Sequence, residues 1–197
     1  MRTLIRGLAL LVVIAALAAC SGGNDEARFQ LTDVSGADFG KALDLTDHTG
    51  RARKLDDFRG KVVVVFFGYT HCPDVCPTTL AELASVMKEL GPAAQRVQVL
   101  FVTVDPERDT PEVLAQYVPS FNPTFLGLHG DADATARAAK SFKVFYQKQT
   151  QAGGGAYTVD HAAGTYILDT DGRLRLFAQY GAGAPALLHD IRALLAS

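Results

Sequence analysis

Two cysteines separated by three residues are the side chains of this chain most able to do chemistry. Cys72 and Cys76 lie between an apolar, β-branched run at residues 62–67 and a helical pattern of apolar residues that continues to Leu90. The pair is therefore placed where a buried strand turns into a helix. The first turn of a helix offers unpaired N–H groups and partial positive charge, which favour a thiolate over a thiol. We expect both sulfurs to be reactive.

Two prolines refine the position of this helix. Proline is tolerated in the first turn of a helix and not in its interior, so Pro77 predicts that the helix begins near that residue. Cys72, followed by Pro73, then lies in the loop. Cysteines with this spacer can close a disulfide or can turn both sulfurs toward one soft metal ion. A purely structural disulfide is the less favoured interpretation, because so short a loop constrains the unfolded chain little.

A metal site needs a donor besides two thiolates, and imidazole is the most suitable one. Of the five histidines, His161 stands between a polar, glycine-containing segment and an apolar strand pattern, from which a ligand can reach distant cysteines. We interpret His161 as the candidate ligand and Asp160 as the acceptor that would orient its ring. A buried histidine satisfied by Asp160 is the alternative. The other histidines are more typical of non-ligand positions: His48, His71, His129 and His189.

The remaining chain alternates between strand and helix patterns. Further strands are predicted at residues 42–47, 97–104 and 124–128, and further helices at residues 111–117, 131–142 and 185–196. Asp131 or Asp133 is placed to cap the helix at 131–142. Residues 164–169 and 173–180 flank an Asp-Gly turn and predict an antiparallel hairpin. Residues 146–160 are polar, contain three consecutive glycines and show no period, which predicts a mobile loop.

This alternation predicts an α/β fold with a mostly parallel central sheet, helices on both faces and a C-terminal β-hairpin. In such sheets function collects at the carboxyl ends of the strands. The cysteine stretch and the segment at residues 105–109 both fall at that edge. Asp105 and Asp109 are therefore candidates to orient the site or to meet a partner. Roles in a turn or a helix cap are equally consistent with their positions.

The N-terminal residues 1–19 are typical of a secretory signal, with basic residues followed by an apolar segment too short to span a membrane. The sequence Leu17-Ala18-Ala19-Cys20 resembles a bacterial lipobox, so we expect Cys20 to be lipidated and residues 20–32 to form a tether. Residues 33–197 then form one domain. The two remaining cysteines belong to an exported protein, where dithiol, disulfide and metal-bound states are all accessible.

Charge excludes one class of partner. The chain carries 19 basic and 21 acidic residues, and removal of Arg2 and Arg6 with the signal leaves 17 against 21, a net charge near −4. A mildly acidic surface argues against nucleic-acid binding. The basic clusters at residues 51–54 and 173–175 are more typical of solvated strand edges or loops than of binding patches.

Three separated motifs, in this order, resemble those of the Sco/SenC family of copper-binding, thioredoxin-like proteins. They are Gly68-Tyr69-Thr70-His71-Cys72-Pro73-Asp74-Val75-Cys76-Pro77, Val104-Asp105-Pro106-Glu107-Arg108-Asp109-Thr110, and Asp160-His161 ahead of Thr165-Tyr166-Ile167-Leu168-Asp169 and Asp171-Gly172. The resemblance covers nearly all of the expected mature domain. It implies a thioredoxin-like sandwich, in agreement with the order of elements predicted above.

The resemblance also implies a function. It implies a membrane-tethered copper chaperone, with Cys72, Cys76 and His161 as copper ligands, that helps assemble the CuA centre of cytochrome c oxidase. The implied partners are the CuA-bearing subunit and, besides it, other periplasmic copper chaperones or thiol–disulfide reductases. The implied location is the periplasmic or exterior side of a bacterial membrane, on the outer face of the cytoplasmic membrane.

Two alternatives use the same side chains. A thiol–disulfide oxidoreductase would use Cys72 and Cys76 as a redox pair that keeps the oxidase subunit's cysteines reduced. Zinc is chemically allowed for two cysteines, one histidine and a fourth donor. Thioredoxin-like reductases typically carry a cis-proline before the strand that faces the cysteines, whereas residues 160–164 contain no proline and offer His161. His161 therefore discriminates between metal binding and redox chemistry.

Overall fold

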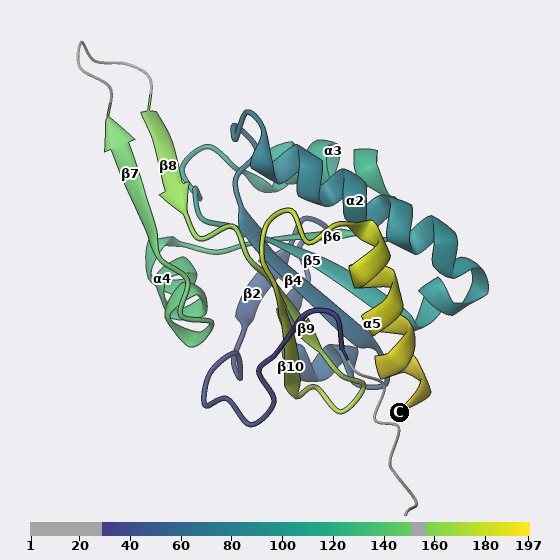
Figure 1. Ribbon diagram of the computed structural model, residues 1–197. Helices are drawn as coiled ribbons and strands as arrows, with labels where there is room; N and C mark the ends of the chain where they lie inside the picture. The colour runs from purple at the N-terminus through teal and green to yellow at the C-terminus, as the bar shows by residue number, and fades with distance from the viewer. Residues whose placement is uncertain (1–28, 151–156) are drawn as a thin grey trace, which may run out of the picture.

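The computed structural model describes residues 29–150 and 157–197 (Figure 1). The predicted signal sequence, Cys20 and most of the predicted tether lie outside the described residues. Within the described part of the chain, no helix combines the length and the apolar character that crossing a membrane requires.

An eight-stranded sheet forms the centre of the protein. Its strands, in spatial order, are β1 (Thr32–Asp33), β10 (Leu174–Ala178), β9 (Thr165–Leu168), β4 (Val62–Gly68), β5 (Val97–Thr103), β6 (Leu126–His129), β2 (Asp44–Asp47) and β3 (Ala52–Lys54). The central strands β4, β5 and β6 are parallel, and the strands outside them pair antiparallel. β9 and β10 form the predicted C-terminal hairpin.

Helices cover both faces of this sheet (Figure 1). They are the α-helices α2 (Val75–Leu90), α3 (Pro111–Phe121), α4 (Ala132–Ser141) and α5 (Ala184–Ala196), and the 3₁₀ helices η1 (Leu55–Phe58) and η2 (Gly91–Arg96). β4 is buried over its whole length, and its side chains alternate between two cores. Val64 packs with α2, α3 and α5 on one face, while Val65 packs with α4 and η1 on the other. The predicted α/β arrangement is therefore confirmed.

The predicted loop at residues 146–160 is wrong for the residues that the structure describes. β7 (Tyr146–Thr150) and β8 (Tyr157–His161) pair antiparallel as a separate two-stranded sheet, with Tyr146 opposite His161. Residues 151–156, with the three glycines, lie outside the described residues. Four of the five β7 residues are exposed. β7 therefore has no apolar alternation for sequence reasoning to detect, and the alternation of β8 is only five residues long.

Element boundaries differ in smaller ways. α2 begins at Val75, two residues before the predicted start, which places Pro77 inside its first turn, where a missing N–H costs nothing. α3 continues past residue 117 to Phe121 with Pro119 inside it. The basic cluster at residues 51–54 contains β3, at the edge of the sheet, as expected of a solvated strand edge. Asp131 caps α4 by accepting a hydrogen bond from the Ala134 N–H at 2.7 Å.

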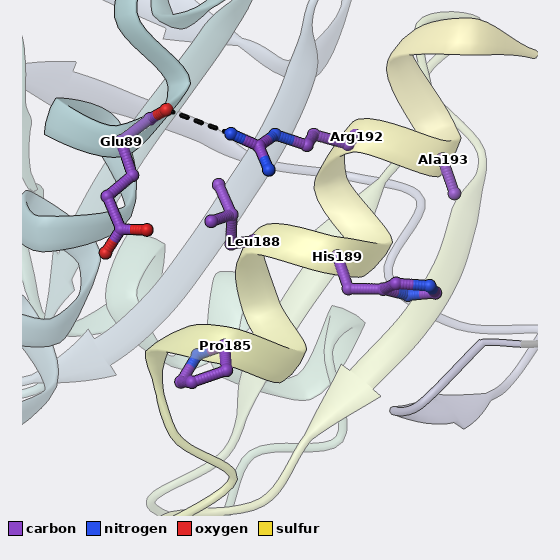
Figure 2. Close-up of a pocket in the computed structure, with 6 residues that line it drawn as sticks. All are labelled: Glu89, Pro185, Leu188, His189, Arg192 and Ala193. Carbon is purple, nitrogen blue, oxygen red and sulfur yellow. Dashed lines mark hydrogen bonds between the residues drawn. The ribbon is translucent and has the colours of Figure 1, made fainter.

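A shallow groove lies between α2 and α5 (Figure 2), where Arg192 donates a hydrogen bond to the Glu89 carbonyl at 3.0 Å. Leu188 and Pro185 provide its apolar lining. Glu89 lies in the last turn of α2 and Cys76 in the first, which separates them by about 20 Å along the helix. The groove is therefore at the opposite end of α2 from the cysteines.

Candidate metal centre

The structure brings Cys72, Cys76 and His161 together at one point. One donor atom from each residue, the two Sγ atoms and a ring nitrogen, lies within 4.8 Å of the others. Cys76 Sγ and His161 Nε2 lie 3.5 Å apart, within hydrogen-bonding distance for sulfur. Cys72 comes from the loop after β4, Cys76 from the first turn of α2 and His161 from the end of β8. Three segments distant in sequence therefore converge, as the predicted site requires.

Cys76 is enclosed by the strand that precedes it. Its side chain is fully buried, and a Cβ atom built on Gly68 would lie only 2.8 Å from its sulfur. Glycine at the end of β4 therefore provides the space that the Cys76 sulfur occupies. Cys72 is half-buried, and its backbone N–H donates to the Tyr69 carbonyl at 3.2 Å. Both cysteines are free thiols, and Cys72 is the one that a partner can reach.

The expectation that the helix start favours a thiolate over a thiol is wrong for Cys76. Burial raises the pKa of the Cys76 thiol far above its ordinary value, and negative charge on Cys72 and Asp109 raises it further. The N–H groups of α2 do not compensate, because removing a thiolate from water costs more than the partial charge of one helix turn returns. Without a metal, Cys76 is therefore protonated at neutral pH.

The ring of His161 is held by aromatic side chains and by the backbone. It packs edge-on against Tyr69 and Phe66, with ring centroids 5.8 and 6.3 Å away. Its Nδ1 faces the Ala162 carbonyl at 3.2 Å, which leaves Nε2 directed at Cys76. Burial lowers the pKa of His161, so the ring is neutral near pH 7 and able to bind a metal.

Asp160 occupies a different place from the one predicted for it. Its carboxylate accepts a hydrogen bond from Gln149 at 2.9 Å, across the β7–β8 ribbon, and the carbonyl of Ala162 takes the position facing the His161 ring. Neighbouring residues of a strand point to opposite faces. Asp160 therefore points away from the face that carries His161, and contributes to that site only through its charge.

The two aspartates of the segment 105–109 hold the two halves of the site. Asp109 is almost fully buried and accepts hydrogen bonds from the Thr70 backbone and hydroxyl, at 3.0 and 2.6 Å, and from the Thr103 hydroxyl at 2.6 Å. These bonds fix the loop that leads to Cys72. Asp105 is also buried, and it accepts from the Tyr157 hydroxyl at 2.8 Å at the start of β8. Asp105 therefore lies on the histidine side of the site.

Sequence reasoning missed the residues that connect these parts. Arg108 lies with its guanidinium carbon 3.7 Å from the centre of the Tyr157 ring and 5.7 Å from that of Tyr69. Gly68 and Arg108 belong to two of the motifs, but no local pattern indicates their contacts with the Cys76 sulfur and the Tyr157 ring, because these contacts depend on packing. The sequence does contain a signal for Tyr157. Tyr157 and His161 are four residues apart, so their side chains share one face if the segment is a strand.

The chemistry of this donor set is that of a soft metal site. Two sulfurs and one neutral imidazole suit copper(I) and zinc, and the imidazole also suits copper(II). Among the residues that the structure describes, no fourth acidic, cysteine or histidine side chain belongs to the group. A closed structural zinc site normally has four protein ligands, so a set of three donors that includes the half-buried Cys72 is more typical of an exchangeable ion.

A family model described as SCO1/SenC matches residues 31–196. The chain belongs to the SCO1/SenC family. The mitochondrial SCO2 homologue of Bos taurus is 45% identical over 138 residues, which are 69% of this chain and 51% of the relative. The chain thus spans about half the length of this curated relative.

Solved Sco structures share the fold. ScoI of Bradyrhizobium japonicum, solved with copper bound, is 39% identical, with a TM-score of 0.73, over 81% of this chain and all of that one (100%). Apo Sco1 of Thermus thermophilus is 44% identical, with a TM-score of 0.77, over 85% of this chain and 97% of that one. These likenesses confirm the predicted thioredoxin-like fold of the SCO1/SenC family for this chain.

Proposed function

We propose that this protein binds one copper ion through Cys72, Cys76 and His161 and acts as a copper chaperone in the assembly of cytochrome c oxidase. The observation that carries the proposal is the convergence of two sulfurs and one neutral imidazole within 4.8 Å. The copper-bound ScoI relative, which is 39% identical, supports copper as the metal. Membership of the SCO1/SenC family supports the role in oxidase assembly.

Exchange of ligands would move the ion to its acceptor. The two thiolates hold copper(I), and each thiol releases its proton to solvent when the copper–sulfur bond forms. An incoming thiolate of the partner would bind the ion while a bond to half-buried Cys72 breaks, and Cys72 would then take up a proton. The acceptor in this proposal is the CuA-bearing subunit of the oxidase, whose cysteines match the softness of the ion.

The remaining parts of the proposal concern where the protein is located and which proteins supply its copper and keep its cysteines reduced. We propose an exported lipoprotein, anchored through Cys20 to the outer face of the cytoplasmic membrane, with residues 33–197 forming the copper-binding domain. The support is the composition of the N-terminal sequence, which lies outside the described residues. Other copper chaperones on that side of the membrane would supply the ion, and thiol–disulfide reductases would keep the two cysteines reduced.

The second candidate function is thiol–disulfide exchange by Cys72 and Cys76. The structure gives it one favourable feature, a half-buried Cys72 able to attack a disulfide, with Cys76 behind it. Burial opposes it, because the raised pKa of Cys76 disfavours the thiolate that would resolve a mixed disulfide. A disulfide between the two sulfurs would also abolish copper binding, since bonded sulfurs are poor ligands.

His161→Ala separates these functions, with His71→Ala as the matched control. His71 adjoins Cys72, but its ring is exposed and faces the Thr70 hydroxyl at 3.1 Å. The full chain, reduced and kept free of oxygen, is titrated with copper(I) in competition with a chelator. We expect one copper per chain in the wild type and in His71→Ala, and affinity lower by roughly tenfold or more in His161→Ala.

Disulfide exchange with a model disulfide is measured on the same proteins. It should be little changed in His161→Ala and abolished when Cys72 is replaced by Ala. Equal copper affinity of His161→Ala and wild type would contradict the chaperone proposal and leave the redox pair. If zinc(II) binds more tightly than copper(I) in the same competition, the proposal of copper as the bound metal is wrong.

A further inference from the structure

The hairpin that carries His161 forms a sheet of its own. β7 pairs with β8 in the two-stranded sheet, and the eight-stranded sheet includes neither. An isolated two-stranded hairpin is only marginally stable in water, and Figure 1 shows this one extending away from the body of the protein. His161 is paired with Tyr146 at the base of the hairpin, and contacts of the hairpin with the body of the protein help to keep its ring beside the cysteines.

One group of these contacts joins Tyr157, the first residue of β8 and the one farthest from His161 along that strand, to the segment 105–109. The Arg108 guanidinium carbon lies 3.7 Å from the centre of the Tyr157 ring, and Arg108 Nη1 donates to the Tyr157 carbonyl at 3.0 Å. The Tyr157 hydroxyl donates to Asp105 at 2.8 Å, and Arg108 Nε also donates to Asp105. Each of these three residues therefore contacts the other two.

Burial makes this cluster stronger than the other charged contact at the hairpin. The side chain of Asp105 is 4% exposed and that of Arg108 is 24% exposed. Breaking a buried charge pair leaves an uncompensated charge, which is strongly unfavourable. The Lys148–Glu107 pair at 2.6 Å is much more exposed, 45% and 69%, and such surface pairs contribute little. Arg108 and Tyr157 therefore provide the buried charged restraint on the hairpin, beside the packing of buried Val159.

The restraint reaches His161 along two paths. Side chains of alternate residues in a strand share a face, so Tyr157, Val159 and His161 all point to the same side of β8. Val159 is buried between the other two. Arg108 also lies 5.7 Å from the centre of the Tyr69 ring, and that ring packs edge-on against the imidazole at 5.8 Å. Displacement of Arg108 would loosen both supports.

We propose that Arg108 and Tyr157 form a latch that positions His161 over the two sulfurs and so determines whether copper has two or three protein ligands. The inference rests on the proposed function and adds how the position of the third copper ligand is determined. When the latch is closed, the imidazole completes the site. When it is released, the hairpin withdraws His161 and leaves two thiolates, which still hold copper(I) but more weakly. Both residues are positioning residues, since neither belongs to the donor group.

Two variants and one matched control test the latch in the full chain. Arg108→Ala removes the ring contact, the bond to the Tyr157 carbonyl and the pair with Asp105. Tyr157→Phe keeps the ring and removes only the bond to Asp105. The control is Arg53→Ala, which breaks the same kind of cluster in β3, where Arg53 pairs with buried Asp47 at 2.7 Å and lies 5.7 Å from the centre of the Phe58 ring.

The first readout needs no copper. The adjacent rings of Tyr69 and Phe66 should shift the NMR signals of the His161 ring protons in the reduced apoprotein. Arg108→Ala should move these signals toward the values of exposed histidines, and Tyr157→Phe should move them part of the way. Arg53→Ala should leave them in place, since its cluster does not contact the hairpin. A role in stability alone would not move these signals.

The second readout is copper(I) affinity by competition with a chelator. Arg108→Ala should weaken binding by roughly 10–100-fold, as does the loss of other side chains that orient metal ligands. Adding Arg108→Ala to His161→Ala should produce no further loss, because the latch acts only through the imidazole. One copper per chain should still bind to each of these variants, because both cysteines remain.

The latch is overturned if Arg108→Ala folds, binds copper(I) as tightly as wild type and leaves the His161 ring signals unshifted. It is also overturned if the losses of copper(I) affinity in Arg108→Ala and His161→Ala are additive in the double variant. Should Arg108→Ala not fold, Arg108→Lys keeps the charge but loses the planar fork, and the same two readouts apply. Failure of His161→Ala to weaken copper binding would refute the proposed function, while the NMR readout would still test the latch.

Discussion

Replacing Gly68 by alanine should move the Cys76 sulfur without mutating any of the three donor residues. The added Cβ would lie 2.8 Å from Cys76 Sγ, 2.9 Å from Phe101 Cε2 and 3.2 Å from Phe66 Cε1. Carbon and sulfur atoms pack at roughly 3.5–4 Å, so the sulfur must retreat by roughly 1 Å. The two phenylalanines are fully buried, and close packing in a core limits how far their rings can move. The variant therefore alters the position of one metal donor.

The cost in stability follows from the same contacts. Extra volume in a packed core typically costs about 1–3 kcal/mol. Alanine also restricts the unfolded chain more than glycine, which returns about 0.4–1 kcal/mol. We therefore expect Gly68→Ala to lower the free energy of unfolding of the reduced apoprotein by about 1–2 kcal/mol. Urea unfolding measures this, and competition with a chelator measures copper(I) affinity, which should fall.

Gly127→Ala is the matched control. Gly127 also lies in a buried strand, β6, and a Cβ there would approach Val118 Cγ2 at 3.0 Å and Leu114 Cβ at 3.1 Å. Its loss of stability should be similar, but its copper affinity should equal that of wild type. If both variants bind copper equally well after correction for folding, the argument that Gly68 positions the Cys76 sulfur is wrong.

Two further predictions concern pH. Burial raises the pKa of Cys76, so copper(I) must displace a proton from its thiol, and copper(I) affinity should rise by about tenfold per pH unit for that proton. The neutral His161 ring adds no such dependence near pH 7. Competition titrations across the neutral pH range measure this affinity, and an affinity that does not change with pH would contradict the prediction. Burial raises the pKa of Asp47, yet hydrogen bonds from Thr49 and Arg53 outweigh it and hold that pKa below its usual range. Asp47→Asn should therefore lose about 2 kcal/mol of stability near neutral pH. This difference should shrink as pH falls below about 4, where wild type loses the same contribution, and unfolding curves that stay equally far apart in acid would refute it.

Much of the fold could be predicted because its signals are local. The run at residues 62–67 is β-branched and apolar because both faces of β4 are buried, and Pro77 constrains where α2 can begin. The β7–β8 hairpin could not be predicted in this way. The exposed residues of β7 carry no periodic pattern, β8 is too short for its alternation to be distinctive, and their pairing depends on backbone hydrogen bonds that any polar residues can make.

By itself, the sequence determined which side chains were candidates for chemistry. Cys72, Cys76 and His161 are the residue types that hold a soft ion, and the order of strands and helices already placed the cysteines at the carboxyl edge of the sheet. Types and order are properties of the chain, so they can be read without coordinates. How deeply each side chain is buried and which way it points are properties of the folded molecule.

The tertiary structure decided the protonation and orientation of those side chains. Packing against Gly68 buries Cys76 and keeps its thiol protonated, against the expectation from the helix start alone. Strand pairing turns Asp160 away, so that the Ala162 carbonyl faces the His161 ring instead. Such features depend on which distant segments come within a few ångströms of one another, because desolvation and hydrogen bonding act only at contact.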